Sequence, residues 1–292
     1  MNIGEIIRDT GFRCNKALGQ NFVTDINLLR GIVADSKVTA DDIVVEIGTG
    51  AGTLTRELAS VCKKVYSFEV DDRLQPVLAL SLQGLENVEV IFRDVLKMRD
   101  SEIAEIVGAP FKVVANLPYY ITTPLVMRFL ESGLDVVGLT VMVQKEVADR
   151  FTAKPNTAEY SAITLAIETA GSATVTRDVS RKMFFPMPNV DSAVVRVDID
   201  RHKLDGENGA LIHKLIRMAF SMRRKTLVNN LSAGLVAPKA DIQAKIVAAG
   251  FAPLIRGEVL SLNDYIALSH QFEKENTENT ENTENTTVED DK

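Results

Sequence analysis

Short apolar runs alternate with amphipathic stretches along most of the chain. Seven runs rich in Val, Ile and Phe lie between residues 43 and 199: IVVEI (43–47), KVYSFEV (64–70), VEVIF (88–92), FKVVAN (111–116), VGLTVMV (137–143), SATVTRDV (172–179) and SAVVRVDI (192–199). The first five are separated by helical stretches such as GTLTRELASV and TPLVMRFLESG. Nearly continuous apolar runs are typical of parallel strands buried on both faces, with helices as crossovers. The pattern predicts a doubly wound α/β sheet.

The end of the chain has a different pattern. The last two apolar runs alternate more and lack an obvious crossover helix, which indicates an antiparallel edge. Beyond residue 200 helical stretches follow one another without strands. We therefore expect one domain over 1–200 and a small helical domain over 203–272. Residues 273–292 contain a polar Glu-Asn-Thr repeat, which predicts a disordered acidic tail.

Charge at first argues against a nucleic-acid partner. The 292 residues include 33 Lys and Arg against 40 Asp and Glu, a net charge of −7. Residues 273–292 hold eight of the acids and two of the bases, a net of −6, so residues 1–272 carry only −1. Since phosphate binding depends on local positive charge, the total excludes nothing about the first 272 residues.

Several classes of protein are disfavoured by composition. Cys14 and Cys62 make no disulfide framework, which favours a reducing compartment and a cytoplasmic location. There is no apolar run of spanning length and no apolar leader with a cleavage site, so we expect no membrane partner. The three histidines are scattered and no Cys-x-x-Cys pair occurs, so we expect no metal site.

A glycine-rich segment, EIGTGAG (46–52), ends one apolar run and opens a helix. Glycines there allow a sharp turn and close approach of a ligand to free amides at a helix N-terminus. A dinucleotide-binding fingerprint would need glycine at position 53, where the chain has Thr53, so a nicotinamide-dependent oxidoreductase is disfavoured. E-x-G-x-G-x-G resembles the first motif of S-adenosylmethionine-dependent methyltransferases. Gly48 and Gly50 are the candidate cofactor-binding glycines.

Acidic residues follow the next two predicted strands. Glu69 ends the second run, 21 positions after Gly48, and Asp94 comes just after the third. A carboxylate at the first position can accept both ribose hydroxyls of a nucleoside ligand. Asp94, at the same edge of the sheet, can accept a hydrogen bond from an adenine amino group. Each acid alone would be an ordinary loop carboxylate, but three consecutive strand ends with this chemistry predict a nucleoside site.

The fourth predicted strand ends in Asn116-Leu117-Pro118-Tyr119. An adenine exocyclic amine is a poor nucleophile, and a sulfonium methyl group is already a strong electrophile, so catalysis needs geometry and hydrogen-bond acceptors. The Asn116 side-chain carbonyl and the Leu117 backbone carbonyl can accept the two amine hydrogens. Pro118 stiffens the turn, and Tyr119 offers a face on which a flipped base can stack. The sequence predicts a site for amine methylation.

A second aromatic segment, MFFPMPNVDS (183–192), precedes the final apolar run. Prolines at 186 and 188 predict an extended loop, and a phenylalanine there can stack on the second face of a base. Without the preceding motifs, an ordinary proline-rich connector with buried aromatics would be the better interpretation.

Together these segments carry a specific resemblance. The motifs that carry it are LGQNF (18–22), EIGTGAG (46–52), FEVD (68–71), NLPY (116–119), QKEV (144–147), FFPMPNVDSAVVR (184–196) and FSMRRKTLVNNL (220–231). Over about residues 8–270 the chain resembles the ribosomal RNA adenine dimethyltransferases, most of all the bacterial small-subunit (KsgA) type.

The resemblance implies a Rossmann-like class I methyltransferase with a mixed, mostly parallel seven-stranded sheet and a small C-terminal helical domain. It implies dimethylation of N6 on two adjacent adenines in the 3′-terminal hairpin loop of 16S rRNA, within the immature 30S subunit, by a monomer. The implied cofactor contacts are Asn21, Val23, Gly48, Glu69, Asp94 and Asn116, and Phe184 takes the place of the stacking phenylalanine. Met187 and Asn189 depart from the residues common there, proline and lysine.

Basic residues cluster where an RNA contact is expected. Between residues 211 and 230 the chain has five bases and no acid: Lys214, Arg217, Arg223, Arg224 and Lys225. Such a run can follow phosphates, although a solvated helix face is the more common explanation. Two alternatives remain: a 23S rRNA methyltransferase of the antibiotic-resistance branch, which the FFPMPNVDS segment disfavours, and a factor that acts mainly by binding the assembling ribosome.

Overall fold

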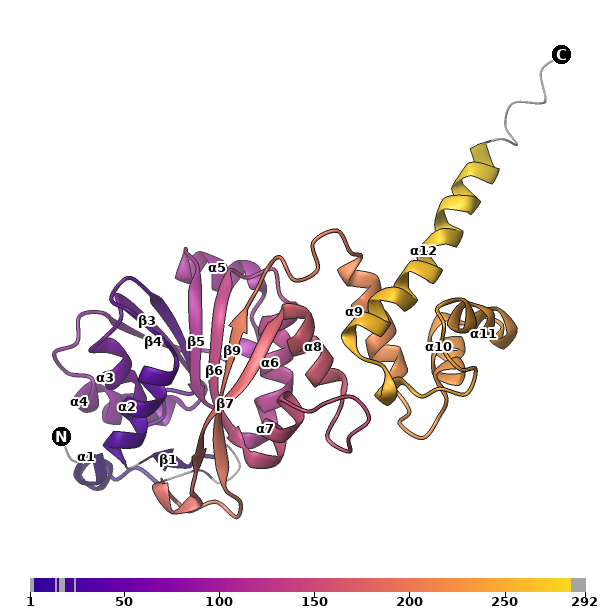
Figure 1. Cartoon of the computed structure of the whole chain (residues 1–292). Helices are drawn as coiled ribbons and strands as arrows, with labels where there is room; N and C mark the ends of the chain where they lie inside the picture. The colour runs from indigo at the N-terminus through magenta and orange to yellow at the C-terminus, as the bar shows by residue number, and fades with distance from the viewer. Residues whose placement is uncertain (1–2, 14, 16–18, 24, 285–292) are drawn as a thin grey trace. The chain divides into compact units, whose positions relative to one another are not determined.

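Figure 1 shows the computed structural model of the chain, which describes residues 3–13, 15, 19–23 and 25–284. The chain divides into two compact units. The first comprises residues 1–152 and 170–200, and the second comprises residues 153–169 together with residue 201 onward. The sequence predicts residues 153–169 within the first domain, whereas in the structure they group with the C-terminal helices.

Within the described residues, seven strands form the main sheet of the first unit: β2 (Ile43–Ile47), β3 (Lys64–Glu69), β4 (Val88–Phe92), β5 (Phe111–Asn116), β6 (Val136–Gln144), β7 (Gly171–Val179) and β9 (Ser192–Ile199). Their order is β4-β3-β2-β5-β6-β9-β7. The first five are parallel, whereas β9 runs antiparallel to both β6 and β7. The predicted mixed, mostly parallel sheet with an antiparallel edge is confirmed.

Helices cover both faces of this sheet (Figure 1). They are α1 (Ile3–Asp9), α2 (Ile26–Asp35), α3 (Thr53–Ala59), α4 (Gln75–Ser81), α5 (Asp100–Val107), α6 (Thr122–Glu131) and α7 (Lys145–Phe151). Because strand side chains alternate between faces, Val114 of β5 packs in one cluster with α2 and α3, whereas Phe111 meets Phe129 of α6 edge to face. Asp25 caps α2, and its side chain accepts the Asn27 and Leu28 N–H groups.

Parallel pairing brings the carboxyl ends of four strands to one edge. Ile47 pairs with Phe68, Glu69 with Phe92, and Glu46 with Val114 of β5. The residues that follow these pairs therefore meet at a single rim, which is where ligands bind in open α/β sheets.

A separate two-stranded ribbon joins two segments that are far apart in the chain. Strand β1 (Phe22–Val23) runs antiparallel to β8 (Phe184–Phe185), with Val23 opposite Phe184. This pairing brings the LGQNF and FFPMP motifs together, which no local sequence pattern indicated.

The second unit has its own core. Its helices are α8 (Ala162–Ala170, whose last residue belongs to the first unit), α9 (Gly209–Ala219), α10 (Leu227–Leu235), α11 (Lys239–Ala248) and α12 (Leu262–Glu284). Tyr160 and Leu165 are fully buried in one cluster with apolar side chains of α9 to α12. The Tyr160 hydroxyl donates to the Leu260 carbonyl at 2.9 Å. This burial explains why residues 153–169 belong with the C-terminal helices.

Among the described residues α12 extends to Glu284. The disorder that the Glu-Asn-Thr repeat predicts for residues 273–292 stays a prediction. Residues 285–292 of the predicted tail, like Cys14, lie outside the described residues. In the described part of the chain, no helix has the length and apolar character needed to cross a membrane.

Candidate active site

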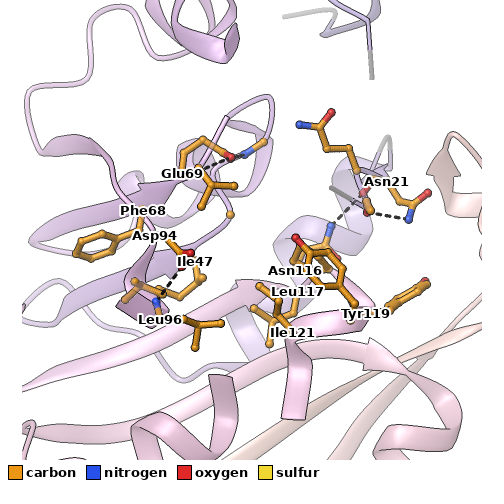
Figure 2. Close-up of a pocket in the computed structure, with 18 of the residues that line it drawn as sticks. Asn21, Ile47, Phe68, Glu69, Asp94, Leu96, Asn116, Leu117, Tyr119 and Ile121 are labelled. Atoms are coloured by element: carbon orange, nitrogen blue, oxygen red, sulfur yellow. Dashed lines mark hydrogen bonds between the residues drawn. The ribbon is translucent and has the colours of Figure 1, made fainter. Parts of the chain in front are cut away.

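A cavity of about 340 Å³ opens at the carboxyl edge of β2 to β5 in the first unit. Among its lining residues are ten of the predicted site residues: Asn21, Gly48, Gly50, Glu69, Asp94, Asn116, Leu117, Pro118, Tyr119 and Phe184. Figure 2 shows Phe68, Glu69 and Asp94 on one side of the cavity and Asn116, Leu117 and Tyr119 on the other. The residues expected to bind a nucleoside thus lie on one side of the cavity, and those expected at the reactive side lie on the other.

Val23 does not line this cavity. Its residue is 2% exposed, and it packs in the apolar cluster beneath α2. The Val23 side chain therefore faces away from the cavity, and a contact between Val23 and the cofactor would involve the Val23 backbone. Leu18, the first residue of the LGQNF motif, lies outside the described residues.

The glycine loop has the backbone that only glycine adopts readily. Gly50 has a φ of 56° and Gly52 a φ of 78°, and Gly52 precedes the first residue of α3, Thr53. A Cβ atom at Gly52 would lie 2.8 Å from the Ser81 hydroxyl oxygen of α4. The third glycine is thus required by close packing of the loop against α4, which explains why it stands at 52.

Glu69 is held by backbone amides. Its Oε1 accepts the N–H groups of Val70 and Asp71 at 2.8 and 2.9 Å, and its Oε2 accepts that of Gly50 at 2.9 Å. Burial raises the pKa of the Glu69 carboxyl. The bond to Gly50 ties the expected ribose acceptor to the glycine loop, so both sides of the nucleoside site are fixed together.

Asp94 occupies the neighbouring strand end. Its Oδ1 accepts the Leu96 N–H at 3.0 Å, and its Oδ2 lies 3.4 Å from the ammonium group of Lys97. The first bond caps the short 3₁₀ turn Val95–Lys97 and orients the carboxylate. Asp94 is therefore positioned as an acceptor at the end of the cavity away from Asn116.

The Asn116 amide has a defined orientation. Its Nδ2 donates to the Asn21 backbone carbonyl at 3.3 Å, drawn as a dashed line in Figure 2. The Leu117 N–H donates to the Met142 carbonyl at 3.3 Å, which anchors the turn to β6. Pro118 is extended, with φ −56° and ψ 131°. Because Nδ2 is engaged, Oδ1 of Asn116 is the atom available to accept a hydrogen from a substrate amine.

Tyr119 and Phe184 supply the aromatic surfaces predicted for a base. The Tyr119 hydroxyl lies 2.9 Å from the hydroxyl of fully buried Ser192 on β9, and burial raises the pKa of the phenol. The phenol therefore stays neutral, and its ring is fixed from the far end. Phe184 is 5% exposed and lines the cavity from β8. Ser192 was missed by the sequence analysis although the NVDS motif contains it.

Glu46, the first residue of the glycine motif, is fully buried beneath the loop. Its Oε2 accepts hydrogen bonds from the hydroxyls of Thr55 at 2.6 Å and Ser67 at 2.7 Å, while its buried Oε1 has no partner among the described residues. Burial raises the pKa of Glu46 to about 8. Ser67 also lies 2.6 Å from the Thr49 hydroxyl, so a neutral Glu46 connects β2, β3, α3 and the loop.

The five predicted RNA-binding residues belong to the second unit and do not line the cavity. Lys214 and Arg217 are exposed on α9, and Arg223, Arg224 and Lys225 are exposed between α9 and α10. The Arg223 guanidinium donates to the Ala158 carbonyl and lies 3.9 Å from the Glu258 carboxylate. Arg223 therefore also holds the loop before α8.

The fold and the cavity together define a class of protein, the class I S-adenosylmethionine-dependent methyltransferases. The matching family model is that of the ribosomal RNA adenine dimethylases, which covers residues 11–250. The chain belongs to the ribosomal RNA adenine dimethylase family.

Curated relatives agree with this assignment. The chain is 40% identical over 269 residues to the ribosomal RNA small subunit methyltransferase A of Clostridioides difficile, covering 91% of this chain and 93% of the relative. It is 43% identical over 279 residues to the protein of the same name in Enterococcus faecalis, covering 92% and 94%.

Solved structures show the same fold. A dimethyladenosine transferase from Plasmodium falciparum matches with a TM-score of 0.71 at 26% identity, covering 87% of this chain and 98% of that one. The 23S rRNA methyltransferase ErmE matches with a TM-score of 0.66 at 26% identity, covering 86% and 99%. The chain thus shares its fold with a dimethyladenosine transferase and with an enzyme named for 23S rRNA.

The cavity fits S-adenosylmethionine, because it combines a glycine loop, a carboxylate on each of two neighbouring strand ends and an adjoining acceptor turn. When bound, the cofactor supplies an electrophilic methyl group. Oδ1 of Asn116 and the Leu117 carbonyl would accept the hydrogens of an adenine amine, and the Tyr119 ring would support the base. These contacts would position the N6 amine to take up that methyl group, and one amine proton would be released for each methyl group gained.

Proposed function

We propose that this protein dimethylates N6 of two adjacent adenines in the 3′-terminal hairpin loop of 16S rRNA. It would act as a monomer in the cytoplasm on the immature 30S subunit, late in its assembly. The choice of the small subunit is supported by the relatives at 40–43% identity, which are named for small-subunit rRNA.

The observation that carries the catalytic assignment is the orientation of Asn116. The Asn21 carbonyl engages Nδ2 and leaves Oδ1 as acceptor, in the same cavity as Glu69 and Asp94. A second acceptor from Leu117 and a fixed aromatic ring from Tyr119 complete a site suited to a planar amine. Glu69 and Asp94 would hold the cofactor's ribose and adenine, and Phe184 would stack on the target base.

Exposed basic residues of the second unit support an RNA substrate. We propose that Lys214, Arg217, Arg223, Arg224 and Lys225 follow rRNA phosphates, because all five are exposed and no acid interrupts the run. Arg223 would do so while also holding the Ala158 carbonyl. Phosphate contacts of this kind position an enzyme on RNA, while the base is selected in the cavity.

The test is methyl transfer from labelled S-adenosylmethionine to purified ribosomal subunits that lack the modification. We expect label on adenine N6 of small subunits and none on large subunits. Transfer to 23S rRNA instead would support the alternative of a 23S rRNA methyltransferase, such as ErmE, whose fold this chain shares. Tight binding of small subunits without transfer would support a purely assembly-related role and contradict the proposal.

A further inference from the structure

Gln20 bridges two segments with both ends of its side chain. Its Oε1 accepts the backbone N–H of Asn15 at 2.7 Å, and its Nε2 donates to Oδ2 of Asp71 at 2.8 Å. The second bond joins residues 51 positions apart in the chain. Gln20 is only half-buried and belongs to no helix or strand, so these two bonds hold its backbone in place.

Asp71 is a rigid acceptor for this bond. It is 4% exposed, and Arg73 donates to both of its carboxylate oxygens. The guanidinium of Arg73 holds the pKa of the Asp71 carboxyl below its usual range, so Asp71 is charged at neutral pH. Its backbone N–H donates to Glu69, so Asp71 moves as one with the expected ribose acceptor.

The residue after Gln20 connects this anchor to the reactive side of the cavity. The Asn21 backbone carbonyl accepts the hydrogen bond from Nδ2 of Asn116. Both Gln20 and Asn21 line the cavity. Consecutive Cα atoms are about 3.8 Å apart, so fixing Gln20 leaves the Asn21 carbonyl little freedom to move.

We propose that Gln20 is a positioning residue for methyl transfer: by linking the segment before β1 to Asp71, it holds the Asn21 carbonyl that orients the Asn116 amide. The inference rests on the proposed function. In this role Gln20 touches neither the reacting amine nor the methyl group. It couples the ribose side of the cavity to the reactive side. Without the anchor, the Asn116 amide loses its fixed partner and its Oδ1 no longer faces the amine for much of the time.

The first test is Gln20→Ala, with steady-state methyl transfer to small subunits and S-adenosylmethionine binding measured by calorimetry. We expect kcat to fall about tenfold and the dissociation constant of the cofactor to rise by less than about threefold, because orientation rather than binding is lost. Gln83→Ala, at an exposed glutamine beyond α4, is the matched control and should match wild type. An equal kcat for Gln20→Ala and wild type would overturn the proposal.

The second test exchanges donor and acceptor and keeps side-chain size, which protects against loss of folding. Gln20→Glu places a carboxylate against Asp71, and Asp71→Asn combined with it restores a donor–acceptor pair. We expect kcat to fall in the Gln20→Glu single variant and to recover in part in the double variant, in which Arg73 keeps one of its two acceptors. A double variant as slow as the single variant would also overturn the proposal. Wild type inactive in the same assay would instead refute the proposed function.

Discussion

Asn116 combines two contacts that its neighbours cannot replace, one to the Asn21 carbonyl and one predicted to the substrate amine. Asn116→Ala removes both but leaves the buried part of β5 intact, so we expect a folded protein. Methyl transfer should slow by roughly 100-fold or more, as when one preorganised polar group is removed from a reacting centre. Single-turnover transfer to small subunits measures this. A rate within a few fold of wild type would remove Asn116 from the mechanism.

Glu46 gives the fold a predicted pH dependence. Burial raises the pKa of Glu46 from 4.5 to about 8. Between these values the unfolded chain releases the proton and the folded chain keeps it, so this group makes the folded state less stable as the pH rises through that window. Glu46→Gln, which mimics the neutral acid, removes this loss. The thermal midpoint of the variant minus that of wild type should therefore increase from about pH 5 to about pH 8 and then level off.

A difference in thermal midpoint that stays constant across that range would show that Glu46 has an ordinary pKa in the folded protein. Thr55→Val is a useful companion variant, because it removes one of the two hydroxyl donors to the same carboxyl. We expect it to raise the pKa of Glu46 further, since that bond favours the charged form.

At the scale of elements, the turn between α9 and α10 carries three exposed bases that we expect to contact RNA. Arg224→Ala combined with Lys225→Ala should weaken binding of small subunits and reduce the dependence of log affinity on log salt by about 1 for each lost phosphate contact. Arg223 is left intact in this test because it also holds the Ala158 carbonyl. Lys239→Ala, at an exposed position on α11, is the control. An unchanged salt slope would exclude the turn from the RNA contact.

The elements differ in how well the sequence predicts them. The five parallel strands and the cavity rim follow from local apolar runs and from the residues just after them, because parallel pairing places strand ends at one edge. The β1–β8 pairing, the Gln20–Asp71 bond and the Tyr119–Ser192 contact were missed. Each joins segments at least 51 positions apart through side chains or two-residue strands, which leave no periodic signal.

At the scale of the whole molecule, charge is unevenly divided. Residues 273–292 carry −6 of the net −7, and the described part of that segment continues α12. We expect this segment to repel RNA that is not the substrate. Deleting residues 274–292 should raise binding to unrelated RNA at low salt, measured by fluorescence anisotropy, and leave methylation of small subunits unchanged. Equal binding to unrelated RNA before and after the deletion would assign the segment no such role.

We propose that this chain places two methyl groups on N6 of each of two adjacent adenines near the 3′ end of 16S rRNA. Mass spectrometry of the 3′ rRNA fragment, taken from unmodified small subunits after reaction with the protein and S-adenosylmethionine, tests this. We expect wild type to dimethylate both adenines and Asn116→Ala to dimethylate neither. A fragment that remains unmodified, or methylation at another position or another atom, would contradict the proposal.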